Sequence, residues 1–182
     1  PGAHNLENLA AAYKITKTLG ISDMIIERAV KNFKGVVFRL QEIGVIDGVT
    51  YVNDTTSTTP IATIMALRAF TGKSIILICG GASKNLDMTD LVKEIKKRAK
   101  AVVLLEGTAT DGIEKSLKVS EFKSLKGRFD NFEKAVLAAK NAAEPGDIVL
   151  LSPACASFGM FINEFDRGEK FNEIVKKSRE KN

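Results

Sequence analysis

The 182-residue sequence has few of the side chains on which metal sites and nucleophilic catalysis usually depend. Its two cysteines, Cys79 and Cys155, are too few for a disulfide framework and lack metal-ligand spacing. The single histidine, His4, is remote from both of them and from any serine-centred arrangement. These absences exclude a structural zinc site and a Ser-His-Asp or Cys-His catalytic set. They also predict a reducing, cytoplasmic compartment.

Long apolar runs are missing as well. Runs such as Ser74–Cys79 and Ala101–Leu105 are far shorter than the roughly 20 residues of a membrane span, so no membrane partner is expected. Lys plus Arg number 27 against 22 Asp plus Glu, but no aromatic residues interleave with the lysines of residues 93–100 and 176–181. This pattern favours solvated helix faces over a nucleic-acid site. The chain starts Pro-Gly-Ala-His without a methionine or a secretory pattern, so we interpret it as part of a longer polypeptide.

The hydrophobic content of 45% is sufficient for one full domain with an appendage. The first 35 residues predict two helices, His4–Leu19 ending at Gly20, and Asp23–Phe33 with Ser22 as the N-cap. Two helices alone cannot bury both of their apolar stripes. We therefore expect them to be the end of a preceding domain.

The period of the apolar residues changes at Gly35. Residues 36–46 and Val49–Asn53 are rich in β-formers and flank Asp47-Gly48, which predicts a hairpin. Strands and helices then alternate, which predicts an α/β fold with a Rossmann-like, doubly wound, mostly parallel sheet. The expected strands are Ser74–Cys79, Ala101–Leu105, Gly127–Phe129 and Asp147–Leu151, and the expected helices are Ile61–Phe70, Met88–Lys97, Gly112–Lys118, Asn131–Ala142 and Glu169–Arg179.

Small, hydrogen-bonding residues follow the predicted strands at one edge of this sheet, where ligands bind in doubly wound folds. Asp54 stands in a threonine-rich loop before Thr59-Pro60, a predicted helix start whose unpaired N–H groups suit an anion. Ordinary turn and cap chemistry is the alternative. We expect a ligand site here, with Arg39, Asp54 and Lys84 as its polar anchors.

Gly72-Lys73-Ser74 is not a phosphate loop, because Leu67 stands where the first glycine belongs and the triplet precedes a strand. Several other motifs together resemble the Mur ligases, in order along essentially the whole chain. They are His4-Asn5-Leu6-Glu7-Asn8, Phe33-Lys34-Gly35 before Arg39-Leu40, Asn53-Asp54 before Thr58, Gly80-Gly81 with Lys84, and Leu150-Leu151-Ser152-Pro153-Ala154-Cys155-Ala156-Ser157-Phe158 with Arg167-Gly168.

The resemblance implies the C-terminal part of an ATP-dependent ligase that adds D-glutamate to UDP-N-acetylmuramoyl-L-alanine through an acyl phosphate, in peptidoglycan synthesis. Residues 1–35 are then the last helices of a central ATPase domain, and residues 36–182 are the C-terminal Rossmann-like domain. The phosphate loop and the Mg²⁺ ligands are expected upstream, together with the N-terminal and central domains. By this resemblance the protein is a monomer, and this fragment alone is inactive.

The resemblance also assigns roles to individual residues. Arg39 and Lys84 are implied as catalytic, because cations stabilise the charge that develops during acyl-phosphate chemistry. No residue of the chain is implied as a metal ligand. The binding residues implied are Asn8 for adenine, Asp54 for the ribose hydroxyls, Arg39 for the phosphates, and Thr58, Lys84 and Ser157 for D-glutamate.

The sequence departs from the family pattern at three positions. Phe38 replaces the usual histidine, Thr56 a lysine, and Glu164 an aromatic residue, with Phe165 beside it. Two further readings stay open: another Mur ligase or a folylpolyglutamate synthase-like ligase, and a non-catalytic nucleotide- or amino-acid-binding module. The diaminopimelate-adding type is disfavoured, because its Asp-Asn-Pro-Arg motif does not occur.

Overall fold

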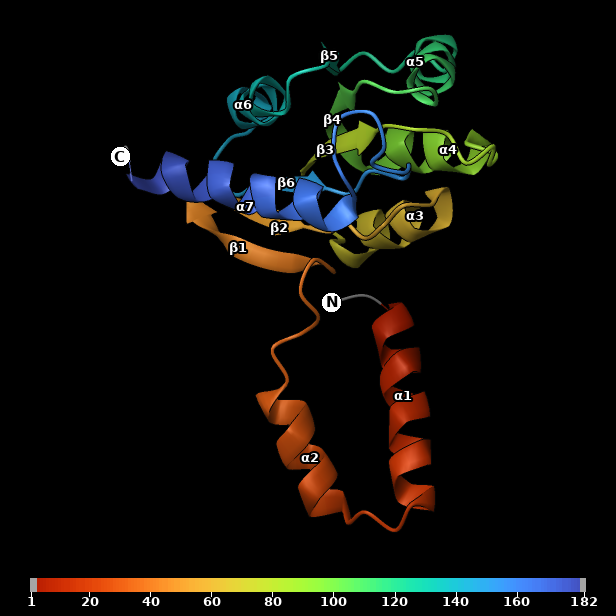
Figure 1. The fold of residues 1–182 in the computed structure, drawn as a ribbon, viewed down its shortest axis with the longest axis vertical. Helices are drawn as coiled ribbons and strands as arrows, with labels where there is room; N and C mark the ends of the chain where they lie inside the picture. The colour runs from red at the N-terminus through yellow and green to blue at the C-terminus, as the bar shows by residue number, and fades with distance from the viewer. Residues whose placement is uncertain (1–2, 181–182) are drawn as a thin grey trace.

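The computed structural model describes residues 3–180, so the outermost residues of the two predicted domains lie outside it. Helices α1 (Ala3–Thr18) and α2 (Asp23–Asn32) form an antiparallel pair that stands apart from the sheet (Figure 1). Ser22 holds the N-cap position of α2, but its side chain makes no capping hydrogen bond. Its carbonyl accepts from the Ile26 N–H at 3.2 Å instead. The predicted side-chain cap at Ser22 is therefore wrong.

The predicted α/β class and the mostly parallel sheet are confirmed. The six-stranded sheet has the order β1-β2-β6-β3-β4-β5, in which only β1 and β2 are antiparallel. Asp47 and Gly48 have φ values of 54° and 77°, as a two-residue hairpin turn requires. The strands are β1 (Gln41–Ile46), β2 (Val49–Asn53), β3 (Ile75–Gly80), β4 (Ala99–Leu105), β5 (Leu125–Phe129) and β6 (Ile148–Leu151).

Helices cover both faces of the sheet. The strand side chains belong to two buried clusters, one on each face of the sheet. Leu77 and Leu150 lie in one cluster, and Ile76 and Val149 lie in the other. Every residue of β3 and β6 is buried, because helices lie on both sides of these parallel strands. The first layer contains α3 (Pro60–Ala69), α4 (Thr89–Arg98) and α5 (Thr110–Val119), and the second contains α6 (Phe132–Ala142) and α7 (Glu164–Glu180) (Figure 1).

Residues 36–40 do not extend the hairpin as predicted. Phe38 and Leu40 have φ values of 65° and 43°, a conformation that L-residues seldom adopt. Hydrogen bonds from the Phe38 N–H to Gln41 Oε1 at 3.0 Å and from the Leu40 N–H to Asp54 Oδ1 at 3.1 Å hold this turn. Side chains outside the segment therefore override its β-rich composition.

Two helix starts also differ from expectation. Helix α7 begins at Glu164 instead of Glu169, because Asn163 Oδ1 accepts from the N–H groups of Phe165 and Asp166, both at 2.9 Å. At α3, Pro60 is in the first turn as predicted, but Thr59 makes no side-chain capping bond. At α6, the Asn131 side chain accepts from the Lys134 N–H at 2.9 Å and caps the helix.

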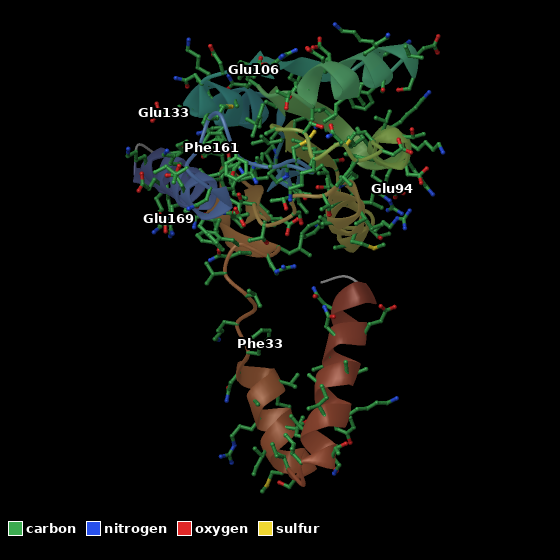
Figure 2. The ribbon with its side chains drawn as sticks, turned by 45° about the vertical axis from the view of Figure 1, so that its right-hand side comes forward. Phe33, Glu94, Glu106, Glu133, Phe161 and Glu169 are labelled. Carbon is green, nitrogen blue, oxygen red and sulfur yellow. The ribbon has the colours of Figure 1, made fainter. Side chains whose placement is uncertain are left out.

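An ion-pair cluster between α3 and α4 makes stability depend on pH. The Glu94 carboxylate (Figure 2) is paired with Arg68 at 2.7 Å and with Arg98, and it is only 10% exposed. The Arg68 hydrogen bond is the first cause that lowers the Glu94 pKa from 4.5 to about 2. Because the pKa of Glu94 is lower in the folded state than in the unfolded state, its ionised form stabilises the fold at a pH above the unfolded-state pKa. This stabilisation is lost as the pH falls toward the folded-state pKa.

We expect Glu94→Gln to lower the free energy of unfolding at pH 7 by about 1 to 2 kcal/mol, since water screens the half-exposed Arg68. The difference from the parent should narrow as the pH falls from 4.5 toward 2. Urea titrations of the chain at a series of pH values measure it. Glu169→Gln, at an exposed carboxylate on α7, is the matched control. A difference that stays constant with pH would contradict the ion-pair explanation.

Candidate functional site

The loops that follow β2, β3, β4 and β6 meet at one edge of the sheet. Ala82 and Ala156 form an isolated antiparallel bridge through two hydrogen bonds of 2.9 and 3.0 Å. The Gly80 N–H donates to Pro153 O at 2.9 Å, which joins the end of β3 to the loop after β6. The carboxyl edge therefore brings together the polar loops in which the sequence predicts a ligand site.

Gly80 and Gly81 admit the chain's own loops at this edge. Their φ values are 108° and 135°, and an added Cβ would lie 2.6 Å from Leu105 O and 2.5 Å from Ala156 O, respectively. Their N–H groups are also bonded, to Pro153 O and, at 3.4 Å, to Thr110 Oγ1. These glycines are therefore needed for loop packing, and their amides are not available to a ligand.

The structure brings the three residues predicted for D-glutamate to this edge. Lys84 Nζ donates to Thr58 Oγ1 at 2.8 Å, across the loops after β3 and β2. Ser157 follows Ala156, whose bridge to Ala82 brings it next to the Lys84 loop. No carboxylate among residues 3–180 forms an ion pair with Lys84. An exposed ammonium beside the Thr58 hydroxyl suits a carboxylate ligand.

The three residues predicted for the nucleotide line a second space. Asn8 from α1, Arg39 from the 36–40 turn and Asp54 from the loop after β2 all border one open cavity of about 1740 Å³. Apolar and polar side chains line both the helical wall and the sheet-domain wall of this cavity. Further lining residues include Leu9, Tyr13, Ile25, Val30, Phe33, Ser57 and Met65. The cavity is larger than the roughly 300 to 1,000 Å³ of a typical ligand pocket, so it has room for a nucleotide, and its lining is mixed.

Asp54 has a structural task in addition to its place at the cavity. Its Oδ1 accepts from the Leu40 N–H at 3.1 Å and its Oδ2 from Ser152 Oγ at 2.7 Å. Burial raises the pKa of this carboxyl, while hydrogen bonds from Ser57, Ser152 and Leu40 oppose the shift. The carboxylate thus connects the 36–40 turn, and Arg39 within it, to the sheet.

Phe38 does not point into the cavity, although it replaces a histidine that the resemblance implies near the nucleotide. Its side chain is 9% exposed and lies against Phe165, with ring centroids 6.1 Å apart. An added Cβ on Gly168 would lie 2.8 Å from the Phe38 ring, so the ring packs directly on α7. Thr56 Oγ1 donates to Phe38 O at 2.9 Å. Phe38 and Thr56 therefore contact each other. The packing of Phe38 on α7 anchors the 36–40 turn.

Sequence reasoning missed several residues that hold these loops in place. Asn53 and Arg167, both fully buried, connect the loop after β2 to α7. Asn53 Nδ2 donates to Asn172 Oδ1 at 2.7 Å and to Gly168 O at 2.9 Å. The Arg-Gly pair contributes to the family resemblance, but no pattern in the sequence marks Arg167 as buried. Ser152, in the 150–158 motif of the family resemblance, holds Asp54 through a hydrogen bond from its Oγ.

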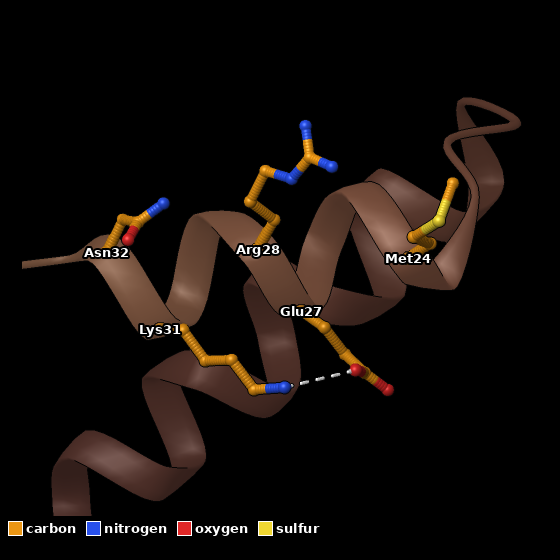
Figure 3. Close-up of a pocket in the computed structure, with 5 residues that line it drawn as sticks. All are labelled: Met24, Glu27, Arg28, Lys31 and Asn32. Carbon is orange, nitrogen blue, oxygen red and sulfur yellow. Dashed lines mark ion pairs between the residues drawn. The ribbon is translucent and has the colours of Figure 1, made fainter.

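A shallow pocket of about 310 Å³ on α2 is not a ligand-binding site. Figure 3 shows that it is lined by side chains of this one helix, Met24, Glu27, Arg28, Lys31 and Asn32. Lys31 and Glu27 form an exposed ion pair at 3.6 Å, one turn apart. None of the predicted site residues borders this pocket. It is an ordinary charged helix surface.

The described residues offer no centre for metal or thiol chemistry. No group of three or more His, Cys, Asp or Glu side chains within residues 3–180 could hold a metal ion. Burial raises the pKa of the Cys79 thiol, and it raises that of Cys155 to about 11. Both thiols therefore stay protonated at neutral pH. Within the same residues, no helix is both long and apolar enough to cross a membrane.

The fold and the polar edge define a Rossmann-like α/β domain preceded by a helical pair. Residues 38–155, more than half of the chain, match the family model described as "Mur ligase, glutamate ligase domain". The chain belongs to the Mur ligase family. A protein from Roseiflexus sp. (strain RS-1) named UDP-N-acetylmuramoylalanine--D-glutamate ligase is 53% identical over 175 residues, which cover 96% of this chain and 37% of the relative.

Solved structures agree on the fold. UDP-N-acetylmuramate-alanine ligase from Thermotoga maritima matches 98% of this chain and 39% of its own, with a TM-score of 0.73 and 20% identity. A MurF ligase from the same organism, in complex with ADP, matches 100% of this chain and 40% of its own, with a TM-score of 0.65 and 22% identity. This chain thus spans well under half the length of these three proteins.

Proposed function

We propose that the chain is the C-terminal part of an ATP-dependent ligase that joins D-glutamate to UDP-N-acetylmuramoyl-L-alanine. The observation that carries the proposal is the 53% identity, over 96% of the chain, to a relative named for that reaction. Its homologous relationship to other Mur ligases supports the ligase class more broadly. In this reaction a substrate carboxylate takes the γ-phosphoryl group of ATP and releases ADP. The amine of D-glutamate then attacks the acyl carbon and displaces phosphate.

We assign residues 1–35 to the end of a central ATPase domain and residues 36–182 to the C-terminal domain. Several large apolar side chains on α1 and α2 are exposed, including Leu6 at 68%, Ile15 at 62% and Met24 at 69%. Exposed apolar surface of this extent is expected to be covered by further protein. The upstream part of a longer polypeptide is the natural cover, and its N-terminal domain would complete the enzyme.

The residues at the cavity fit an adenine nucleotide. In our proposal the Asn8 amide contacts adenine, Asp54 accepts from the ribose hydroxyls and Arg39 contacts the phosphates. Asp54 accepts hydrogen bonds from Leu40, Ser152 and Ser57. A carboxylate has about four acceptor sites, so one remains for a ligand. No group of three or more His, Cys, Asp or Glu side chains among residues 3–180 could hold a metal ion. In our proposal the phosphate loop and the magnesium ligands lie upstream of this chain.

Lys84, Thr58 and Ser157 form the proposed D-glutamate pocket. The ammonium pairs with a carboxylate of the amino acid, and the two hydroxyl groups complete its hydrogen bonds. Fixed in this way, the amine of D-glutamate is directed at the acyl phosphate, and the bimolecular step becomes effectively unimolecular. Arg39, on the nucleotide side, stabilises negative charge on the phosphates. Nothing in this account requires a covalent bond to the protein.

The test uses the full-length polypeptide that contains this chain. With ATP, Mg²⁺ and UDP-N-acetylmuramoyl-L-alanine, we expect phosphate release and a new amide product only when D-glutamate is added, as measured by a phosphate assay and mass spectrometry. The 182-residue chain alone should release none. Incorporation of another amino acid, or of glutamate into a folate, would assign a different ligase. If the full-length polypeptide turns over with none of these substrates, the non-catalytic binding module is favoured. Turnover by the 182-residue chain alone would refute the proposal that the active site is shared with upstream domains.

A further inference from the structure

Arg167 at the start of α7 is the largest fully buried side chain of the described residues. It has no carboxylate partner among them, which is unusual because a buried cation is normally paired. Its Nε donates to Thr55 Oγ1 at 2.9 Å and its Nη2 to Thr55 O at 2.8 Å. Its Nη1 reaches Cys155 O at 3.5 Å. All three contacts go to the two loops that carry the proposed ligand residues.

The surroundings of Arg167 explain why the guanidinium stays in place. Its Cζ lies 5.9 Å from the centre of the Phe161 ring. Phe161, labelled in Figure 2, is on the same side of the sheet as α6 and α7. Burial lowers the pKa of Arg167 to about 10, so the group remains a cation at neutral pH. A methionine of similar length would avoid this desolvation, but it could not make the three hydrogen bonds.

The two loops that Arg167 joins carry different parts of the site. Thr55 follows Asp54 and precedes Thr58, whereas Cys155 stands two residues before Ser157. Asp54 has independent anchors in Ser152 and the Leu40 N–H. Apart from the guanidinium, one backbone bond, from the Ala154 N–H to Ser57 O at 2.9 Å, also connects the loops near Thr58 and Ser157. Loss of the guanidinium should therefore displace Thr58 and Ser157 more than Asp54.

We propose that Arg167 is a positioning residue for the amino-acid pocket: its planar guanidinium fixes the spacing between the loop after β2 and the loop after β6 without touching a ligand. The inference rests on the proposed function for the identity of the ligand, D-glutamate. The fork is essential to this role, because a single ammonium group cannot bond Thr55 Oγ1, Thr55 O and Cys155 O in the same geometry.

The test compares Arg167→Met and Arg167→Lys in the full-length polypeptide. Arg167→Met should raise the KM for D-glutamate by about 10- to 100-fold, as a misplaced binding group does, and leave the KM for ATP nearly unchanged. Arg167→Lys, which keeps the charge, should recover only part of the loss. Arg98→Met, at a partly buried arginine in α4 away from this edge, is the control and should change neither KM. Full recovery in Arg167→Lys, or equal changes for both substrates, would overturn the inference.

A milder pair of variants covers the case in which Arg167→Met does not fold. Thr55→Val removes one acceptor of the fork at nearly constant volume and should raise the KM for D-glutamate, whereas Thr55→Ser should restore it. Amide hydrogen exchange separates this inference from the proposed function, because it needs no substrate. Exchange should be faster in residues 55–58 and 154–157 of Arg167→Lys and Thr55→Val than in the parent. Unchanged exchange in these residues refutes the positioning role, even if the parent protein adds D-glutamate. If the parent protein does not use D-glutamate, only the proposed function is refuted.

Discussion

Lys84→Ala in the full-length polypeptide is expected to raise the KM for D-glutamate by about 10- to 150-fold, the equivalent of one charged hydrogen bond of about 1.5 to 3 kcal/mol. The KM for ATP should change little, because Lys84 does not border the cavity that holds Asn8, Arg39 and Asp54. The contact from Lys84 Nζ to Thr58 Oγ1 is 2.8 Å long and exposed, so the alanine variant should fold normally. Initial rates at saturating ATP and nucleotide substrate measure the effect.

Two further variants sharpen this prediction. Lys84→Arg should recover only part of the loss, because a planar fork does not replace a compact ammonium in a small pocket. D-glutamine should lose much of its disadvantage relative to D-glutamate in Lys84→Ala, since its amide had no charge to pair. Lys93→Ala, which removes an exposed lysine of α4 that pairs with Asp90, is the matched control. If Lys84→Ala shifts the KM for ATP instead, the lysine is a phosphate contact and the pocket assignment is wrong.

Asp54→Ala should raise the KM for ATP by about 10- to 150-fold and that for D-glutamate much less, because a charged acceptor for the ribose hydroxyls is lost. The same change should lower the free energy of unfolding, since the Leu40 N–H and Ser152 Oγ lose their acceptor. Steady-state kinetics below the unfolding temperature, together with a thermal melt, separate the two effects.

Ser152→Ala is the control for the structural part of the Asp54 effect. It removes the 2.7 Å hydrogen bond to Asp54 Oδ2 and leaves the carboxylate in the cavity wall. We expect it to lower stability while the KM for ATP stays close to that of the parent. If Ser152→Ala reproduces the whole change in KM, Asp54 acts only by anchoring the 36–40 turn, and its proposed contact with ribose is refuted.

The helices and strands could be predicted closely where local pattern and packing agree. The apolar runs that became β3, β4 and β6 are continuous because helices bury both of their faces, and Asp47-Gly48 adopts the φ values that its turn needs. The predictions failed at Ser22, at residues 36–40 and at the start of α7. At residues 36–40 a side chain distant in the sequence, Asp54, decides the backbone path, whereas the start of α7 is decided by the adjacent Asn163.

The candidate site also has features that the sequence predicts and features that only the structure shows. Which strand ends carry polar side chains can be read from the chain, because the carboxyl ends of parallel strands meet at one edge. That rule led to Asp54 and Lys84, and the family resemblance added Asn8, Thr58 and Ser157. Neither the rule nor the resemblance could show that the N–H groups of Gly80 and Gly81 bond other loops, or that Phe38 turns toward α7.

The sequence by itself determined the fold class, the family and the edge of the sheet at which the polar loops gather, because these depend on periodicity, on turn residues and on motifs that are local in the chain. Only the tertiary structure decided how those loops are held. Arg167 and Thr55 are 112 positions apart, and Ser152 and Asp54 are 98 apart. Hydrogen bonds across such separations leave no periodic signal, since they form only after the sheet has brought the loops together.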